Sequence, residues 1–401
     1  SPYPYHCALV LEEILTDPAF GETREEREAF LHRGRVTLRT ALEPEAIAGA
    51  QDVVEDRLGL DNEYKARLAV VRPGTGELVA VAQNTEWDET QVVLANSAQQ
   101  TGSAFKPITL AAAFEQGTSP GLRMNGSSPY FSSLDNPPSG FKNSWSGIGG
   151  MHDARSATRV SNNIYFVRLA ERTGVRNVAA TANRIGLSLP TNLTGREVAI
   201  TLGSYESTPI EMATAYATFA TGGITCDPHT ITAVVDDVTG EELPAPDPDC
   251  RRTMTAAVAD TVTELLTEPL KPGGTAAGMG IGRPAAGKTG STNNWAIANF
   301  AGYTPQYSTA LWVADPTGPN SNPLRGVRLD GAVVGIGDAG SVAAPIWQRT
   351  MRALHADEPR LDLGGHPGSY RIGQGGDVAP SLVGLQMEAA VGAAQSAGLE
   401  V

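Results

Sequence analysis

The stretch Thr101-Gly-Ser-Ala-Phe-Lys-Pro-Ile-Thr-Leu-Ala-Ala-Ala-Phe114 places a serine and a lysine three positions apart at the start of an apolar run. The run from Ile108 to Phe114 predicts a buried helix. Positions i and i+3 of a helix share a face, so we expect the Ser103 hydroxyl and the Lys106 amine to meet. Pro107 fits because it falls in about the first turn, where few backbone hydrogen bonds are lost. The stretch therefore predicts Ser103 as a nucleophile and Lys106 as its base.

A second Ser-x-x-Lys match, Ser139-Gly-Phe-Lys142, is a rival for this role. It follows two prolines in a loop-like stretch, and a match this short also arises by chance. We therefore expect Ser139 to be a loop residue.

Lysine is scarce in this chain, with five lysines against 25 arginines. A guanidinium does not lose its proton in a protein, so the lysines are the cations that can become neutral bases. At its unperturbed pKa, lysine is neutral in only about one molecule in 2,500 at pH 7. Burial or a neighbouring cation must lower that pKa. Lys288, in Lys288-Thr-Gly-Ser291, is the predicted cation.

Ser161 and Asn163 form a third pattern, in a predicted helix running from Ala154 towards Glu171. A hydroxyl could relay a proton to a leaving group, and an amide could hold a substrate amide. Such residues are also common as helix caps or on surfaces, and Ser291-Thr-Asn293 is a second match. The order of the three patterns along the chain favours the catalytic interpretation of Ser161 and Asn163.

The segment Gly282-Arg-Pro-Ala-Ala-Gly-Lys-Thr289 also matches a phosphate-binding loop, which would indicate a nucleotide hydrolase. That loop must follow a strand and open a helix. Here a stretch rich in Gly and Pro, Leu270 to Gly282, precedes it, and an apparent strand follows. We therefore reject the nucleotide interpretation.

The hydrophobic pattern indicates an α+β fold. A β-hairpin is predicted from Ala66–Val71 and Leu78–Ala82, and strands return at Trp295–Gly302 and Tyr307–Ala314. The long region between them, from Phe105 into the 270s, reads as helices and loops. Sheet strands at both ends of a helical insertion predict one unit whose sheet is closed by distant segments. Helices are expected at Glu43–Leu58, Pro209–Ala220, Thr253–Leu266 and Val342–His355.

The formal net charge of −14 argues against binding to nucleic acid or to an anionic membrane surface. No run reaches the roughly 18 apolar residues of a spanning helix, so a membrane anchor is expected outside this chain.

Cys226 and Cys250 flank a predicted strand pair, and we expect a disulfide between them in an oxidising compartment, with two buried thiols as the alternative. Cys7 has no predicted role.

The chain ends read differently from its centre. Residues 1–40 are charged and mixed and are predicted to be a connector, and residues 41–360 form the main domain. Residues 361–376 read as a linker rich in Gly and Pro. Residues 377–401 look like the start of another module.

Taken together, the three patterns resemble the transpeptidase domain of penicillin-binding proteins. The likeness runs over roughly residues 40–355 and includes further segments: Gln99–Leu110, Thr201–Ser204, Glu211–Tyr216 and Phe300–Pro305. It implies the penicillin-binding and serine β-lactamase-like fold, an antiparallel sheet flanked by helices. It also implies a bifunctional class A member whose glycosyltransferase domain would precede Ser1, on the extracytoplasmic side of the membrane. The tail is similar to the start of a PASTA module, a combination familiar from actinobacterial members.

The resemblance assigns roles to individual residues. Ser103 would attack the penultimate D-Ala carbonyl of a peptidoglycan stem peptide, and Lys106 would take its proton. Ser161 would relay the proton to the departing D-Ala, and Asn163 would hold the substrate amide. The remaining implied site residues are Lys288 in the proton network and Thr289, Gly290 and Ser291 at the terminal carboxylate. The oxyanion would lie between the backbone amides of Ser103 and Ser291.

The implied activity needs no cofactor or metal, and β-lactams would acylate Ser103. Proteins of cell-wall synthesis and division are the expected partners. Three rivals remain: a serine β-lactamase, a D,D-carboxypeptidase, and a non-enzymatic β-lactam sensor or wall-binding module in which acylation is only a signal. The first is disfavoured because the pattern Glu-x-x-Leu-Asn, which supplies the deacylating glutamate of class A β-lactamases, is absent.

Overall fold

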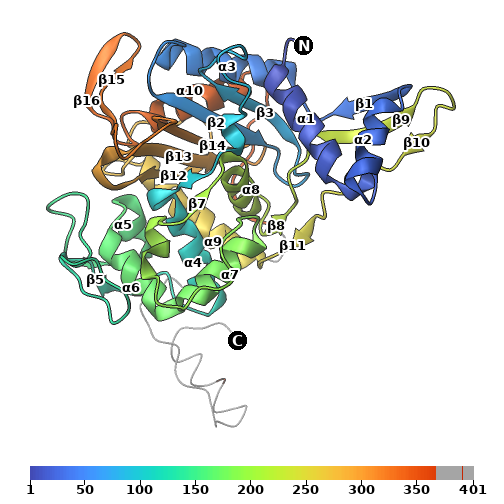
Figure 1. The fold of residues 1–401 in the computed structure, drawn as a ribbon. Coiled ribbons are helices and arrows are strands. Elements are labelled where there is room, and N and C mark those ends of the chain that lie inside the picture. Colours follow the sequence, from blue (N-terminus) through green and yellow to red (C-terminus); the bar gives the residue numbers. More distant parts are fainter. Residues whose placement is uncertain (367–390, 392–401) are drawn as a thin grey trace.

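The computed structural model describes residues 1–366 and residue 391. A five-stranded antiparallel sheet lies at its centre (Figure 1). The strands, in spatial order, are β12 (Ala286–Ser291), β13 (Ile297–Tyr303), β14 (Ser308–Ala314), β2 (Lys65–Val71) and β3 (Leu78–Gln83). The pairing of β14 with β2 joins two halves of the chain, as the hydrophobic pattern predicted. The strand β12, with Lys288 in it, was not predicted, and it forms one edge of the sheet.

Alternate apolar residues of the central strands β2 and β14 enter two different cores, as the two-residue period of a strand requires. In β2, Leu68 and Val70 belong to one core, and Ala69 and Val71 belong to the other. Both faces of the sheet are therefore covered, and all seven residues of β2 are buried.

Two helices cover one face, and the helical insertion covers the other (Figure 1). The first pair is α3 (Pro44–Leu58) and α10 (Ala343–Leu354). The insertion contributes α4 (Lys106–Glu115), α5 (Ala154–Arg159), α6 (Asn163–Thr173), α7 (Val175–Arg184), α8 (Pro209–Ala220) and α9 (Ala256–Leu266). Of these, α8 lies directly against β14 and β2. The α+β architecture with its helical insertion is as predicted.

The helix α8 illustrates how the sequence sets a boundary. The Thr208 hydroxyl accepts a hydrogen bond from the backbone N–H of Glu211, and the Glu211 carboxylate accepts one from the backbone N–H of Thr208. This capping box satisfies orphan N–H groups of the first turn. Pro209 occupies the first position, where its missing N–H costs nothing.

The single helix predicted from Ala154 towards Glu171 is wrong. The structure has α5, a break, and then α6. Asn162 causes the break by capping α6: its side-chain oxygen accepts from the backbone N–H of Tyr165 at 2.8 Å, and its amide donates to the carbonyls of Gly126 and Ile148. Ser161 therefore lies between two helices, with a φ of 55°.

The first 40 residues form α1 (Pro4–Thr16), α2 (Arg24–His32) and β1 (Val36–Thr40). They pack onto the rest of the chain, because Leu9 enters a main core and β1 pairs with β9 (Ile231–Asp236). The boundary at residue 40 remains a prediction. The proposed linker is described only as far as His366, and the PASTA-like segment, apart from residue 391, lies outside the described residues.

The remaining elements are short. Strand pairs form between β4 (Gln99–Gln100) and β7 (Glu206–Ser207), β5 (Met124–Asn125) and β6 (Met151–His152), β8 (Ile224–Thr225) and β11 (Arg251–Arg252), β15 (Arg325–Leu329) and β16 (Ala332–Ile336), and β9 and β10 (Glu242–Leu243). The 3₁₀ turns are η1 (Pro18–Phe20), η2 (Leu94–Asn96), η3 (Gly102–Phe105), η4 (Val198–Leu202), η5 (Glu268–Leu270) and η6 (Asn293–Trp295). In the part of the chain that the structure describes, no helix has the length and apolarity to cross a bilayer.

Candidate active site

Ser103 lies in the tight turn η3, immediately before α4, and Lys106 is the first residue of that helix. Gly102, which precedes Ser103, has a φ of 53°, and a Cβ at this position would lie 2.8 Å from the carbonyl oxygen of Ser291. Only glycine lets this turn approach β12 so closely. The turn thereby brings the candidate nucleophile against the edge of the sheet.

Two side chains that the sequence analysis missed hold this turn in place. Tyr216 of α8 donates from its hydroxyl to the carbonyl of Ala104 at 2.7 Å. Asn299 of β13 donates from Nδ2 to the carbonyl of Thr101 at 2.8 Å. Tyr216 ends the Glu211–Tyr216 segment of the family resemblance, but no local pattern gives either residue this role, because each reaches the turn from a distant element.

Ser161 connects the two scarce lysines. Its Oγ lies 3.0 Å from Lys106 Nζ and 2.8 Å from Lys288 Nζ. Lys106 also donates to the Ser161 carbonyl and to Asn163 Oδ1, at 2.7 Å each. Among the described residues, these are the hydrogen bonds of Lys106, so the expected contact with Ser103 is not one of them. The Lys106 amine instead contacts the backbone carbonyl of Ser161, in the break between α5 and α6, and the side-chain oxygen of Asn163, at the start of α6.

Both lysine side chains are fully buried, at 0% exposure. Burial lowers the pKa of Lys106 well below its usual value, and the positive charge of Lys288 lowers it further. Burial also lowers the pKa of Lys288, to about 7. Burial and the charge of Lys288 therefore both favour the neutral form of Lys106, as a general base requires.

Asn163 is held from a second side. Its Nδ2 donates to the carbonyl of Lys142 at 2.9 Å, and its backbone N–H donates to Asn143 Oδ1 at 2.9 Å. The second Ser-x-x-Lys match, Ser139 to Lys142, lies outside any described helix, as predicted. Its loop nevertheless borders the site, through backbone contacts that the sequence pattern did not reveal.

The strand β12 carries Lys288, Thr289, Gly290 and Ser291 along the sheet edge, paired with β13. The Thr289 hydroxyl lies 2.6 Å from that of Thr275, and Ser291 Oγ accepts from the backbone N–H of Ala339 at 3.1 Å. Since the phosphate-loop motif would require Lys288 to precede a helix, its place inside a strand excludes that motif.

Gly290 is required by packing. A Cβ there would lie 1.8 Å from Asn299 Oδ1 and 2.6 Å from the Thr101 carbonyl oxygen. The same asparagine that binds the nucleophile turn therefore lies directly against β12. The structure thus places the eight predicted site residues in η3, at the first positions of α4 and α6, at the break before α6 and on β12.

Cys226 and Cys250 are joined, with an S–S distance of 2.06 Å, next to the β8 and β11 pair. Cys7 is a free, exposed thiol. Within residues 1–366, no cluster of three His, Cys, Asp or Glu side chains is arranged to hold a metal ion.

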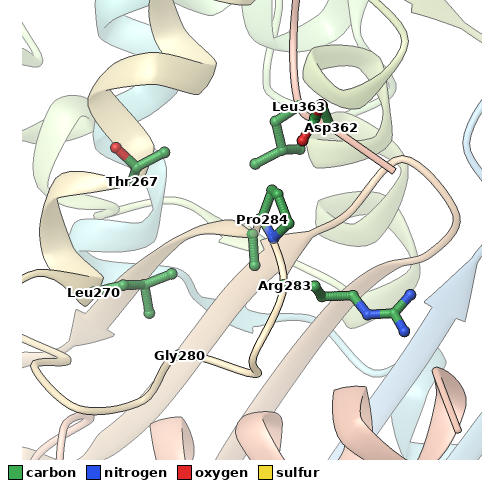
Figure 2. A pocket seen from close by; sticks show the side chains of 8 residues that line it. Thr267, Leu270, Gly280, Arg283, Pro284, Asp362 and Leu363 are labelled. Carbon is green, nitrogen blue, oxygen red and sulfur yellow. The ribbon is translucent and has the colours of Figure 1, made fainter. Parts of the chain in front are cut away.

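A pocket of about 440 Å³ lies next to the segment that leads into β12, at the N-terminal end of that strand (Figure 2). Its lining includes Thr267 and Leu270 around η5, and Arg283 and Pro284 on the segment that leads into β12. None of the eight predicted site residues lines it.

Residues 68–326 match the family described as the penicillin binding protein transpeptidase domain. This chain belongs to that family. Among curated relatives, penicillin-binding protein 1A of Mycobacterium tuberculosis is 31% identical over 405 residues, covering 91% of this chain and 47% of the relative. Penicillin-binding protein 1A of Clostridium acetobutylicum is 25% identical over 396 residues, covering 92% and 47%.

The penicillin-binding protein fold is also found among solved structures. PonA1 from Mycobacterium tuberculosis, in complex with penicillin V, superposes with a TM-score of 0.74 at 26% identity, covering 93% of this chain and 99% of that one. The chain spans about half the length of the curated relatives cited above. As a penicillin-binding protein transpeptidase domain, it is a member of a family of serine acyltransferases.

Proposed function

We propose that this domain is a D,D-transpeptidase that crosslinks peptidoglycan stem peptides through an acyl-enzyme at Ser103. The observation that carries the proposal is the position of Ser161 Oγ between two buried lysines, beside the turn that bears Ser103. This arrangement supplies a nucleophile, a base of lowered pKa and a hydroxyl that can pass a proton between them.

The first half-reaction forms the acyl-enzyme. Ser103 Oγ attacks the carbonyl carbon of the penultimate D-Ala while its proton passes to neutral Lys106. The tetrahedral intermediate collapses, the peptide C–N bond breaks, and the departing D-Ala amine takes up a proton through Ser161. The backbone amides of Ser103 and Ser291 are the proposed donors to the oxyanion.

The neutral form of Lys106 can satisfy its short hydrogen bonds and keep a lone pair for a proton. A neutral amine has two hydrogens and one lone pair. The two carbonyl-type oxygens at 2.7 Å, on Ser161 and Asn163, take both hydrogens. The lone pair is then left to take the proton of Ser103, and the resulting ammonium can donate to the hydroxyl of Ser161.

The terminal carboxylate of the donor peptide is assigned to Thr289 and Ser291. Ser291 Oγ already accepts from the backbone of Ala339, so its own hydrogen remains available to a carboxylate. Charged Lys288, next to Thr289, adds electrostatic attraction for the same group. In the second half-reaction an acceptor amine attacks the ester, and Ser103 takes back a proton.

β-Lactams would acylate Ser103 because they mimic the donor. The proposal is tested by incubation with penicillin, intact-protein mass spectrometry and peptide mapping. We expect one long-lived adduct on Ser103 and none in Ser103→Ala. Undiminished labelling of that variant would overturn the assignment, and rapid turnover of the adduct would favour a β-lactamase. Release of D-Ala without crosslinking in the presence of acceptor would favour a carboxypeptidase.

We further propose that the domain belongs to a bifunctional class A protein on the extracytoplasmic side of the membrane. The similarity to penicillin-binding protein 1A supports the class. The bond between Cys226 and Cys250 supports the compartment, since disulfides persist where the environment is oxidising.

A further inference from the structure

A buried carboxylate, Glu268, lies on the segment that contacts both α5, just before Ser161, and the strand that carries Lys288. Glu268 lies in η5, on the segment between α9 and β12, and is 1% exposed. An ionised carboxylate at this depth must be paired with cations to be stable. Three cations surround it, and two of them, Arg155 and Arg159, come from α5.

The geometry of these pairs is specific. Glu268 Oε1 accepts from Arg155 Nη1 at 2.6 Å and from Lys271 Nζ at 2.9 Å. Oε2 accepts from Arg159 Nε at 2.8 Å and also from its Nη2, so that arginine binds with both arms of its fork. Burial alone would raise the pKa of this carboxyl, but the hydrogen bonds from the three cations lower it to about 2. The group is therefore an anion at every working pH.

The same segment also contacts β12. Past Glu268, the backbone N–H of Thr275 donates to the carbonyl of Arg159 at 3.1 Å. The Thr275 hydroxyl lies 2.6 Å from that of Thr289. One short segment thus holds the end of α5 and the strand that carries Lys288.

Ser161 follows Arg159 by two residues, beyond the end of α5. Its positive φ is disfavoured for a residue with a Cβ, so the surrounding structure must impose it. We propose that Glu268 is a positioning residue for acylation: it anchors the two arginines of α5 so that Ser161 Oγ lies between the lysines. The inference rests on the proposed function.

Two residues that line the pocket lie on either side of Glu268 in sequence: Thr267, just before η5, and Leu270, the last residue of η5 (Figure 2). The carboxylate between them is directed instead to the arginines of α5. The contacts of the Glu268 carboxylate are therefore internal to the domain.

The test compares Glu268→Gln with Glu268→Asp in the whole chain, by stopped flow with a fluorescent penicillin. The amide loses the charge and turns an N–H₂ group towards a cation, whereas aspartate keeps the charge on a shorter arm. We expect Glu268→Gln to lower the acylation rate constant about tenfold or more, with noncovalent affinity changed by less than about twofold. Aspartate should recover part of the rate. A loss of affinity alone, or an equal loss in both variants, would contradict a positioning role.

Asp330→Asn is the matched control, because Asp330 also pairs with two arginines, Arg57 and Arg349, from α3 and α10. It should leave the acylation rate constant unchanged. If Glu268→Gln does not fold, the same rate constant is measured in Arg159→Lys. This variant keeps the positive charge but loses the two-armed bond to Glu268, so its acylation should also be slower. A parental rate constant in the folded variant would overturn the inference. Absence of labelling in the parent chain would instead overturn the proposed function.

Discussion

Lys288 Nζ donates to Ser161 Oγ over 2.8 Å, across a sequence separation of 127 residues. Burial lowers the pKa of Lys288 to about 7, and the pKa of Lys106 is driven well below its usual value. The charge of Lys288 therefore helps to keep Lys106 neutral. Both amines donate to the Ser161 hydroxyl, so in the proposed mechanism this one serine can pass a proton from Lys106 to the departing amine.

Replacing Lys288 with methionine should move the acid limb of the acylation pH profile to higher pH. The variant removes the nearby positive charge, so the pKa of Lys106 rises and its neutral form appears only at higher pH. The measurement is the acylation rate constant of a β-lactam from acid to neutral pH. Lys142→Met serves as control, because the Lys142 side chain is exposed and only its carbonyl contacts the site. An unmoved limb in Lys288→Met would contradict the electrostatic role.

Ser161→Ala should slow acylation by about 10²- to 10⁴-fold, the usual range for a lost proton-transfer group. Alanine keeps the same disfavoured backbone conformation, so the change removes the hydroxyl without easing strain. Ser139→Ala, in the second Ser-x-x-Lys match, should acylate like the parent chain. Equal rates in both variants would show that Ser161 does not carry the proton.

Gly290→Ala should lower the free energy of unfolding by about 1 to 3 kcal/mol or more and abolish labelling. The added methyl would lie 1.8 Å from Asn299 Oδ1, so the side chain that binds the nucleophile turn would have to move. Gly280→Ala is the control, because nothing lies within 4 Å of a Cβ at that position. Urea denaturation and penicillin labelling measure the two effects. Parental stability in Gly290→Ala would contradict the packing.

Nonreducing peptide mapping should recover Cys226 linked to Cys250, with Cys7 alkylated. The bond closes a segment with a sequence separation of 24, and losing such a crosslink costs about 3 kcal/mol in the chain-entropy model. Replacing both cysteines with alanine should therefore lower the melting temperature but leave acylation of the folded fraction intact. Alkylation of both cysteines without prior reduction would refute the pairing.

Several features of the fold could be read from the chain. The sheet strands β2, β3, β13 and β14 lie in short apolar segments that were predicted as strands, and α8 follows from its apolar spacing. These signals are local, since they depend on side chains only a few positions apart. The helix predicted through Ser161 failed because Asn162 caps α6 by reaching the carbonyls of Gly126 and Ile148. A tertiary contact there overrides a helical pattern.

By itself, the sequence determined which residue types are available for the chemistry: a serine and a lysine three positions apart, a Ser-x-Asn pair and a second scarce lysine flanked by glycines. Only the tertiary structure decided how they act together. Ser161 meets Lys288 because the break after α5 and the edge strand β12 approach each other, and burial together with the charge of Lys288 lowers the pKa of Lys106. Desolvation and charge interaction depend on distance in space, so spacing along the chain could not specify them.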